Sequence, residues 1–142
     1  MKGFVLSLVM LTLMVGSLYA EKLPNRYENY ADAHAAAVKQ DKRMFVMFTA
    51  SWCDPCTRFK RNVLYRKAIW ESLEKWFVIH LVDTDVETET VTLFRKTGYP
   101  CNTVPTLFFL NQGATKVTGV NVGGLSATNF RRWYNIVHKI KE

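Results

Sequence analysis

Two cysteines three positions apart are the residues of this chain whose type and spacing carry the clearest chemistry. Cys53 and Cys56 belong to the run Trp-Cys-Asp-Pro-Cys at 52–56, which follows the apolar segment 44–48. If Cys56 opens a helix, the chain turns back so that the two sulfurs can meet in a disulfide. Cys53 then lies at the helix N-terminus, where the backbone dipole favours thiolate over thiol. A thiolate with a second thiol in reach is what reversible disulfide exchange requires.

The segments around the pair predict how it is held in place. Segment 44–49 is almost entirely apolar, which is typical of a strand covered on both faces inside a parallel or mixed sheet. Pro55 suits the first turn of the next helix, because its missing N–H would have no partner there. The same criteria predict further strands at 77–82, 106–110 and 116–120, and helices at 27–40, 56–76 with a break near Tyr65, 86–97 and 126–140. This order implies an α/β fold with a small mixed sheet and helices on both faces.

The first twenty residues have the pattern of an export signal. A basic residue precedes an apolar core at 4–15, and small residues follow it. We expect a signal peptide at 1–20 cleaved after Ala20, with cleavage after Ser17 as the alternative. An uncleaved membrane anchor is a further alternative, although the apolar core is shorter than the roughly 20 residues of a membrane-spanning helix. Residues 21–142 then suffice for a single domain.

The chain is basic, with 19 Lys and Arg against 12 Asp and Glu and a formal net charge of +7. The cations gather just after the cysteine pair and near the C-terminus: Arg58, Lys60, Arg61, Arg66 and Lys67, then Arg131, Arg132, Lys139 and Lys141. Solvated helix faces account for such clusters, and steering toward acidic partners or an anionic membrane surface is the alternative. No nucleic-acid-binding motif accompanies the charge, so we expect no nucleic acid partner.

A third cysteine, Cys101, helps to interpret the other two. Three cysteines in an exported chain cannot all pair internally, and the spacing of Cys53 and Cys56 makes them the pair. A short exported domain held together by disulfides would carry more cysteines, so a catalytic pair is favoured over a structural one. Half of a zinc site is a further alternative, but the remaining ligands would have to come from Cys101, His34, His80 and His138. We expect no metal. Cys101 itself is either a buried spectator thiol or a regulatory one.

From about residue 30 to residue 140 the chain resembles the thioredoxin family. Three motifs carry the resemblance: the run at 52–56 matches the family's Trp-Cys-x-Pro-Cys, Val-Pro-Thr at 104–106 matches its cis-proline loop, and Val-Gly-Gly-Leu-Ser at 122–126 matches the Val-Gly-x-Leu-Ser that begins its last helix. A lone Cys-x-x-Cys is a weak signal, whereas the three motifs in this order are specific. The resemblance implies a thioredoxin-like fold with a central mixed sheet of about four strands and helices on both faces.

The resemblance also assigns roles to individual residues. It implies that Cys53 attacks a substrate disulfide with an exposed sulfur, and that Cys56, shielded on the first helical turn, resolves the mixed disulfide. A cis peptide bond at Pro105 would expose the backbone of Val104 for pairing with a substrate peptide. Gly123 would line the other side of the groove, and the Trp52 ring would shield the thiol and contact substrate. No cofactor is implied beyond the Cys53–Cys56 disulfide.

The chain departs from the family pattern at positions that tune the thiols. Met47 occupies the position where thioredoxin has a buried acid, and no His lies between the cysteines. Asp54 and Pro55 separate the cysteines and modulate the pKa of the pair, because the Asp54 charge disfavours a neighbouring thiolate. We therefore expect the Cys53 pKa near the upper end of the roughly 3.5–7.5 range of such sites, and a reducing poise. His80, near a family lysine position, is expected to be structural.

These features predict an exported protein-disulfide oxidoreductase that is reducing or isomerase-like. The chain looks most like exported domains such as the C-terminal domain of periplasmic reductases, which receive electrons through a membrane partner. We accordingly expect protein thiols and disulfides as substrates, a possible membrane-embedded electron donor, a monomer, and a periplasmic or secreted location. The alternatives are a redox-inactive thioredoxin-fold adaptor and a dedicated maturation factor for another exported protein.

Overall fold

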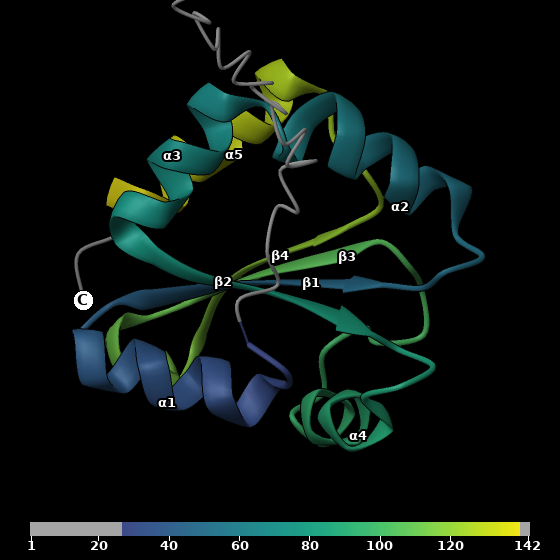
Figure 1. Ribbon diagram of the computed structural model, residues 1–142, viewed down its shortest axis with the longest axis vertical. Helices are drawn as coiled ribbons and strands as arrows, with labels where there is room; N and C mark the ends of the chain where they lie inside the picture. Colours follow the sequence, from purple (N-terminus) through teal and green to yellow (C-terminus); the bar gives the residue numbers. More distant parts are fainter. Residues whose placement is uncertain (1–26, 140–142) are drawn as a thin grey trace, which may run out of the picture.

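The computed structural model describes residues 27–139, which form a four-stranded mixed sheet between two layers of helices (Figure 1). The predicted signal peptide at 1–20, with both cleavage positions, lies outside the described residues. Within 27–139, no helix has both the length and the apolar character needed to cross a bilayer. The predicted α/β architecture, a mixed sheet of about four strands with helices on both faces, is confirmed.

The sheet has the strand order β2-β1-β3-β4, with β1 and β2 parallel and the other neighbours antiparallel. Its strands are β1 (Arg43–Thr49), β2 (Phe77–Asp83), β3 (Thr106–Leu110) and β4 (Val117–Val122). β4 ends two residues later than predicted, because Val122 still pairs with Thr106. That extension brings the following glycine beside the start of β3.

Helices cover both faces of the sheet (Figure 1). We call the side of α2 (Asp54–Phe59), α3 (Lys67–Trp76) and α5 (Ala127–Lys139) the disulfide face, and the side of α1 (Tyr30–Gln40) and α4 (Thr88–Lys96) the far face. α2 runs without interruption into a π-helical turn, η1 (Lys60–Leu64), and a short 3-10 turn, η2 (Gln112–Ala114), joins β3 to β4.

Local side chains explain where the helices begin and end. α1 begins three residues later than predicted, because the Asn29 side chain accepts the N–H of Asp32 at 2.9 Å and caps the helix there. The break predicted near Tyr65 is confirmed, since that residue ends η1 and the chain re-enters a helix at Lys67. Ser126 caps α5 by accepting the N–H of Asn129.

Alternation along the central strand divides the core into two apolar clusters. Phe45 and Met47 of β1 lie in the cluster that contains Cys53 and Cys56, on the disulfide face. Their neighbours Met44, Val46 and Phe48 belong to the far-face cluster, which also holds Cys101. Because successive strand side chains point to opposite faces, one apolar strand supplies both clusters.

Candidate active site

The amino end of α2 holds the cysteine pair. Cys53 and Cys56 form a disulfide with Cα atoms 5.3 Å apart. Cys53 is the N-cap residue of α2, and its Sγ accepts the backbone N–H of Cys56 at 3.2 Å. Pro55 lies in the first turn, where its missing N–H leaves no donor unsatisfied. The sulfur of Cys53 therefore occupies the place that a capping oxygen takes in other helices.

The exposure of Cys53 differs from the prediction. An exposed Cys53 sulfur was expected, yet the residue is only 3 % exposed, and Cys56 is fully buried. The capping geometry is the physical reason, because it turns the Cys53 Sγ back toward the helix and into the disulfide-face cluster. The order of exposure still agrees with the predicted roles, since Cys53 is the outer cysteine of the pair.

An exposed tryptophan stands beside the disulfide in a fixed orientation. Trp52 is 68 % exposed, and its indole N–H donates to the Asp85 carboxylate at 2.8 Å. Asp85 in turn donates its backbone N–H to the Asp83 side chain. The contact between Trp52 and Asp85 was not predicted from the sequence. The parallel pairing of Thr49 with Asp83 brings the ends of β1 and β2 together, and only that register reveals the contact.

The two loops predicted to form the substrate groove meet each other. The Val104–Pro105 peptide bond is cis, and Val104 packs against the cluster that contains both cysteines. Gly123 donates its N–H to the Pro105 carbonyl at 2.7 Å. Gly123 has a φ of +93°, which side chains with a Cβ rarely adopt, so glycine is required by the backbone here. The structure thus brings the 104–105 loop to Gly123.

Met47 leaves the interior behind the disulfide without a carboxylate. Its side chain is fully buried in the disulfide-face cluster and its strand partner is Leu81, which is also apolar. Apart from the cysteines, Tyr134 is the one buried residue of that cluster that carries a titratable group. Deprotonation of Cys56 therefore has no internal carboxylate base among residues 27–139.

His80 lies on the far face and not near the cysteines. It is fully buried in β2, and its Nε2–H donates to the Glu87 carboxylate at 2.8 Å. Burial lowers the pKa of His80 below its usual value, although Glu87 opposes this effect. The structural role predicted for His80 fits this environment. Side-chain alternation in β2 turns His80 away from the cysteines, because its strand partner Val46 also belongs to the far-face cluster.

Cys101 also belongs to the far face. It is a free thiol, 5 % exposed, whose S–H donates to the carbonyl oxygen of Tyr99 at 3.2 Å. Burial raises the pKa of this thiol, while Arg95 acts in the opposite direction. These observations favour the spectator role over the regulatory one. Nor do three or more His, Cys, Asp or Glu side chains gather as a metal site anywhere in 27–139.

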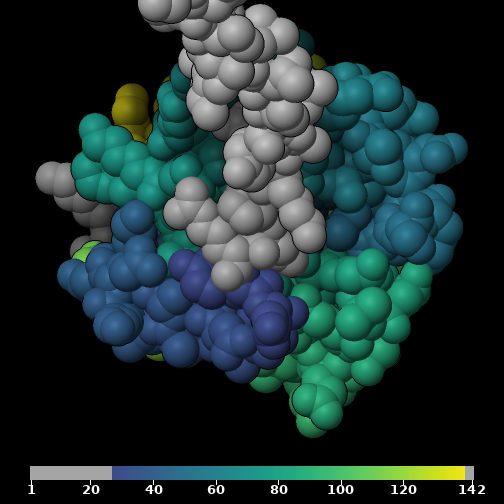
Figure 2. Space-filling view, in the orientation of Figure 1, coloured from purple at the N-terminus to yellow at the C-terminus, as the bar shows by residue number. Residues whose placement is uncertain are grey.

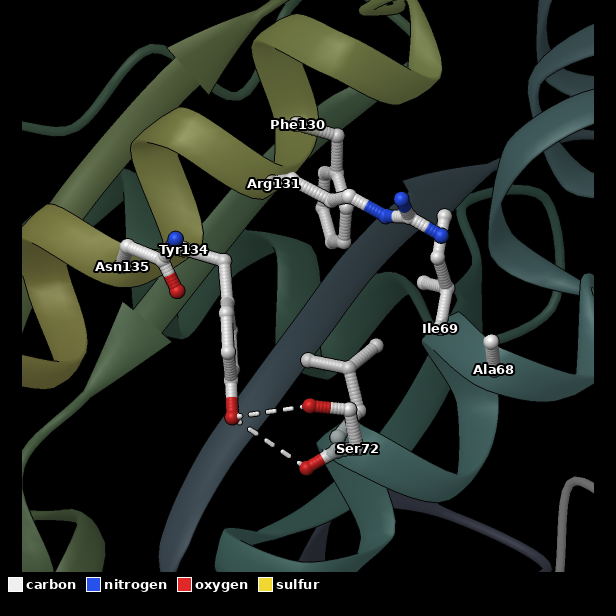
Figure 3. A pocket seen from close by; sticks show the side chains of 8 residues that line it. Ala68, Ile69, Ser72, Phe130, Arg131, Tyr134 and Asn135 are labelled. Atoms are coloured by element: carbon white, nitrogen blue, oxygen red, sulfur yellow. Dashed lines mark hydrogen bonds between the residues drawn. The ribbon is translucent and has the colours of Figure 1, made fainter.

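A separate small hollow lies between α3 and α5 (Figure 3). It has a volume of about 200 Å³, and Ile69 and Arg131 lie on its walls. The Tyr134 hydroxyl donates to the Ser72 carbonyl at 3.2 Å and tethers the two helices at this point. No sulfur lines this hollow, so the redox chemistry belongs to the edge of the sheet where α2 begins.

Comparison with known proteins identifies the family of the chain. Residues 25–112, more than half of the chain, match the sequence model of the family described as thioredoxin-like. The chain belongs to the thioredoxin-like family. As a member with a Cys53–Cys56 disulfide, it is a thiol–disulfide oxidoreductase. The predicted family and enzyme class are confirmed.

Solved thioredoxin-like structures share the fold at low sequence identity. A thioredoxin from Thermus thermophilus is 24% identical with a TM-score of 0.66, and the match covers 78% of this chain and 84% of that one. A DsbH oxidoreductase is 19% identical with a TM-score of 0.61, covering 81% and 85%. The oxidised C-terminal domain of DsbD from Neisseria meningitidis is 21% identical with a TM-score of 0.59, covering 73% and 89%. The comparison with curated protein sequences gave no match.

Proposed function

We propose that this thioredoxin-like protein is exported and that it reduces or isomerises disulfides in protein substrates, with Cys53 as the nucleophile. The observation that carries the proposal is the hydrogen bond from the Cys56 N–H to the Cys53 Sγ at the amino end of α2. After reduction, this donor and the helix dipole favour the Cys53 thiolate. Cys56 is fully buried and is therefore suited to resolution, not to the first attack.

The proposed reaction proceeds in two exchange steps. The Cys53 thiolate attacks one sulfur of a substrate disulfide, forms a mixed disulfide and releases the other substrate sulfur as a thiolate, which takes up a proton. The Cys56 thiolate then attacks the Cys53 sulfur, re-forms the Cys53–Cys56 disulfide and releases the second substrate thiol. Two electrons pass to the substrate, and an external dithiol donor must return them. We propose a membrane-embedded donor for this step, and no cofactor other than the disulfide.

Four residues around the disulfide are proposed to hold the substrate. The backbone of Val104 pairs with an extended substrate segment, Pro105 leaves no donor beside the sulfurs, and Gly123 lines the opposite side. The exposed ring of Trp52 provides apolar contact at the outer edge, where the Asp85 carboxylate fixes its orientation. A monomer suffices for this arrangement, because every proposed contact lies on one chain.

The reducing direction follows from the residues between the cysteines. Asp54 adds a negative charge beside the reactive sulfur, and no histidine is present there to stabilise the thiolate. Asp54 and Pro55 therefore modulate the thiol pKa toward a more reducing disulfide. We expect a reduction potential nearer the roughly −270 mV of thioredoxin than the roughly −120 mV of the strongly oxidising DsbA. Titration against a glutathione redox buffer measures it, and a potential near −120 mV contradicts the reducing assignment.

Insulin reduction tests the enzyme role directly. With dithiothreitol as the electron source, the wild-type protein is expected to accelerate insulin precipitation, and Cys53→Ser is expected to abolish the acceleration. Equal rates for the two proteins would point to a redox-inactive adaptor. A wild-type protein that does not accelerate insulin reduction but reduces the haem-attachment cysteines of an exported protein would indicate a dedicated maturation factor.

Export has its own test, because it rests on the predicted signal at 1–20 alone. Expression in a bacterium with fractionation is expected to place the protein outside the cytoplasm. N-terminal sequencing is expected to find a chain that begins after Ala20, or after Ser17. A chain that keeps its N-terminus and stays in the cytoplasmic fraction contradicts export, and a chain retained in the membrane fraction indicates an uncleaved anchor.

A further inference from the structure

A groove lies along α2, the helix whose first turn holds the disulfide. It has a volume of about 450 Å³ and lies between the α2–η1 segment and residues 124–127. Pro55 lines it at the end nearest the cysteines, and Gly124 lies against the ring of Phe59 in its floor. Since Gly124 directly follows Gly123, the groove continues from the proposed substrate-binding loop.

The groove combines an apolar floor with cationic walls. Phe59 and Val63 are buried in its floor, and the exposed side chains of Arg58 and Arg66 line it. No acidic side chain is among the residues that line it. Neither arginine forms an ion pair with another residue of 27–139. Two guanidinium groups beside one groove thus have no carboxylate partner within 27–139 and can bind carboxylates of a substrate.

Acidic side chains lie where β2 leads into α4. Asp83 ends β2, Asp85 in the following turn holds Trp52, and Glu89 lies in the first turn of α4. The α2 and α4 segments lie on opposite sides of the carboxyl end of β1 (Figure 1), and their surfaces adjoin at the same edge of the molecule (Figure 2). A polypeptide that lies across the amino end of α2 therefore meets the carboxylates of Asp83, Asp85 and Glu89, the acidic rim, on the α4 side and the two guanidinium groups on the groove side.

We propose that this groove binds an acidic segment of the substrate polypeptide next to its reacting cysteine. The proposal rests on the proposed function and names its substrate class: protein disulfides flanked by Asp or Glu on one side. Guanidinium groups bind carboxylates with paired hydrogen bonds, and the floor at Phe59 accepts an apolar side chain between them. The acidic rim repels the same segment, so the charges also set the direction in which the substrate lies.

Peptide substrates that differ in one segment test the proposal. Two disulfide-containing peptides, identical except that three Glu beside the cysteine are replaced by Gln, are reduced by the dithiothreitol-regenerated full chain at low salt. We expect kcat/KM to be about fivefold to tenfold higher for the Glu peptide. One exposed ion pair gives only a small preference, but the peptide forms two, one with each arginine, and their effects combine. The Glu/Gln ratio is expected to fall toward one at about 0.5 M salt.

Charge variants locate the effect in the groove. The double variant Arg58→Gln/Arg66→Gln is expected to lose the Glu/Gln preference. Arg95→Gln/Lys96→Gln, which removes the same charge from exposed residues of α4, is expected to keep it. Because the ratio compares two peptides on one enzyme, a general loss of folded protein does not alter it.

The remaining outcomes of these experiments distinguish failure of the groove proposal from failure of the proposed function. Equal reduction of both peptides by the wild-type protein overturns the groove and leaves the oxidoreductase intact, whereas failure to reduce either peptide contradicts the proposed function itself. Equal loss of the ratio in both double variants overturns the groove in favour of overall charge. Absence of a peptide preference, combined with groove-dependent retention on vesicles containing phosphatidylserine, would assign the arginines to an anionic membrane and overturn the proposal.

Discussion

The two faces of the sheet each bury cysteine sulfur, but they offer it opposite hydrogen bonds. On the disulfide face, the Cys53 Sγ accepts a backbone N–H at the start of a helix. On the far face, the Cys101 S–H donates to a backbone carbonyl oxygen. A donor beside sulfur favours the thiolate, whereas an acceptor favours the neutral thiol. Because Cys53 and Cys101 are 3 % and 5 % exposed, burial alone does not distinguish the proposed nucleophile from the third cysteine.

The largest expected effect separates the resolving cysteine from Cys101. Cys56→Ser is expected to stop turnover and to leave Cys53 in mixed disulfides with protein substrates, because no second thiol remains to release them. Cys101→Ser, the matched control, is expected to form no such adducts and to keep wild-type turnover. Non-reducing electrophoresis and mass spectrometry measure the adducts. Persistent adducts with Cys101→Ser would show that Cys101 also takes part in resolution, which contradicts the proposed difference between the two faces.

A pair of glycine substitutions separates strain at the site from strain elsewhere. Gly123 and Gly98 have φ values of +93° and +81°, and a Cβ at either position meets no atom within 4 Å. Gly123→Ala and Gly98→Ala are each expected to lower the free energy of unfolding by about 1–2 kcal/mol through backbone strain alone. Urea denaturation measures this loss. Only Gly123→Ala is expected to lower kcat/KM as well, and equal kinetic loss at Gly98 would contradict the proposed groove.

The hydrogen bond that orients Trp52 gives a smaller effect. Asp85→Ala is expected to lower kcat/KM for protein substrates by about threefold to tenfold, because one hydrogen bond of roughly 1 kcal/mol no longer fixes the exposed ring. Asp85→Asn retains an acceptor and is expected to recover most of the activity. Steady-state insulin reduction compares the variants. An unchanged kcat/KM in Asp85→Ala would show that the hydrogen bond to the Trp52 ring does not contribute to substrate reduction.

The smallest effect concerns the pH dependence of stability at the far face. Well above pH 6.5, the ordinary pKa of histidine, His80 is neutral in both the folded and the unfolded chain. As the pH falls below this value, the unfolded chain takes up a proton that buried His80 resists, because its pKa is lowered in the fold. Stability is therefore expected to fall as the solution is acidified from pH 7 to 5.

A substitution isolates this contribution of His80. His80→Gln keeps a donor for Glu87 but cannot titrate, so the decline below pH 6.5 is expected to be shallower in the variant than in the wild type. Urea midpoints between pH 5 and 7.5 provide the comparison. An identical decline in both proteins would mean that other groups carry the whole effect.

The sequence predicts the position of the cysteine pair in the fold, but not the individual side-chain contacts around it. The apolar strand before Cys53 and the helix-compatible Pro55 predict where the pair lies, because both signals are local. The order of helices and strands and the family resemblance predict the layers around it. The capping contact that buries the Cys53 sulfur was not predictable, since it depends on side-chain direction. The contact between Trp52 and Asp85 depends on the register of two strands far apart in the sequence. The far-face position of His80 depends on the alternation in β2.

The most direct test of the contrast between the faces is the pH dependence of thiol alkylation in the reduced, folded protein. Iodoacetamide labelling followed by peptide mass spectrometry reports Cys53 and Cys101 in one sample. The helix-capped Cys53 is expected to react with an apparent pKa below the roughly 8.5 of a free thiol, and Cys101 is expected to react only after unfolding. A Cys53 that titrates like a free thiol, or a Cys101 that reacts as fast, would contradict the account.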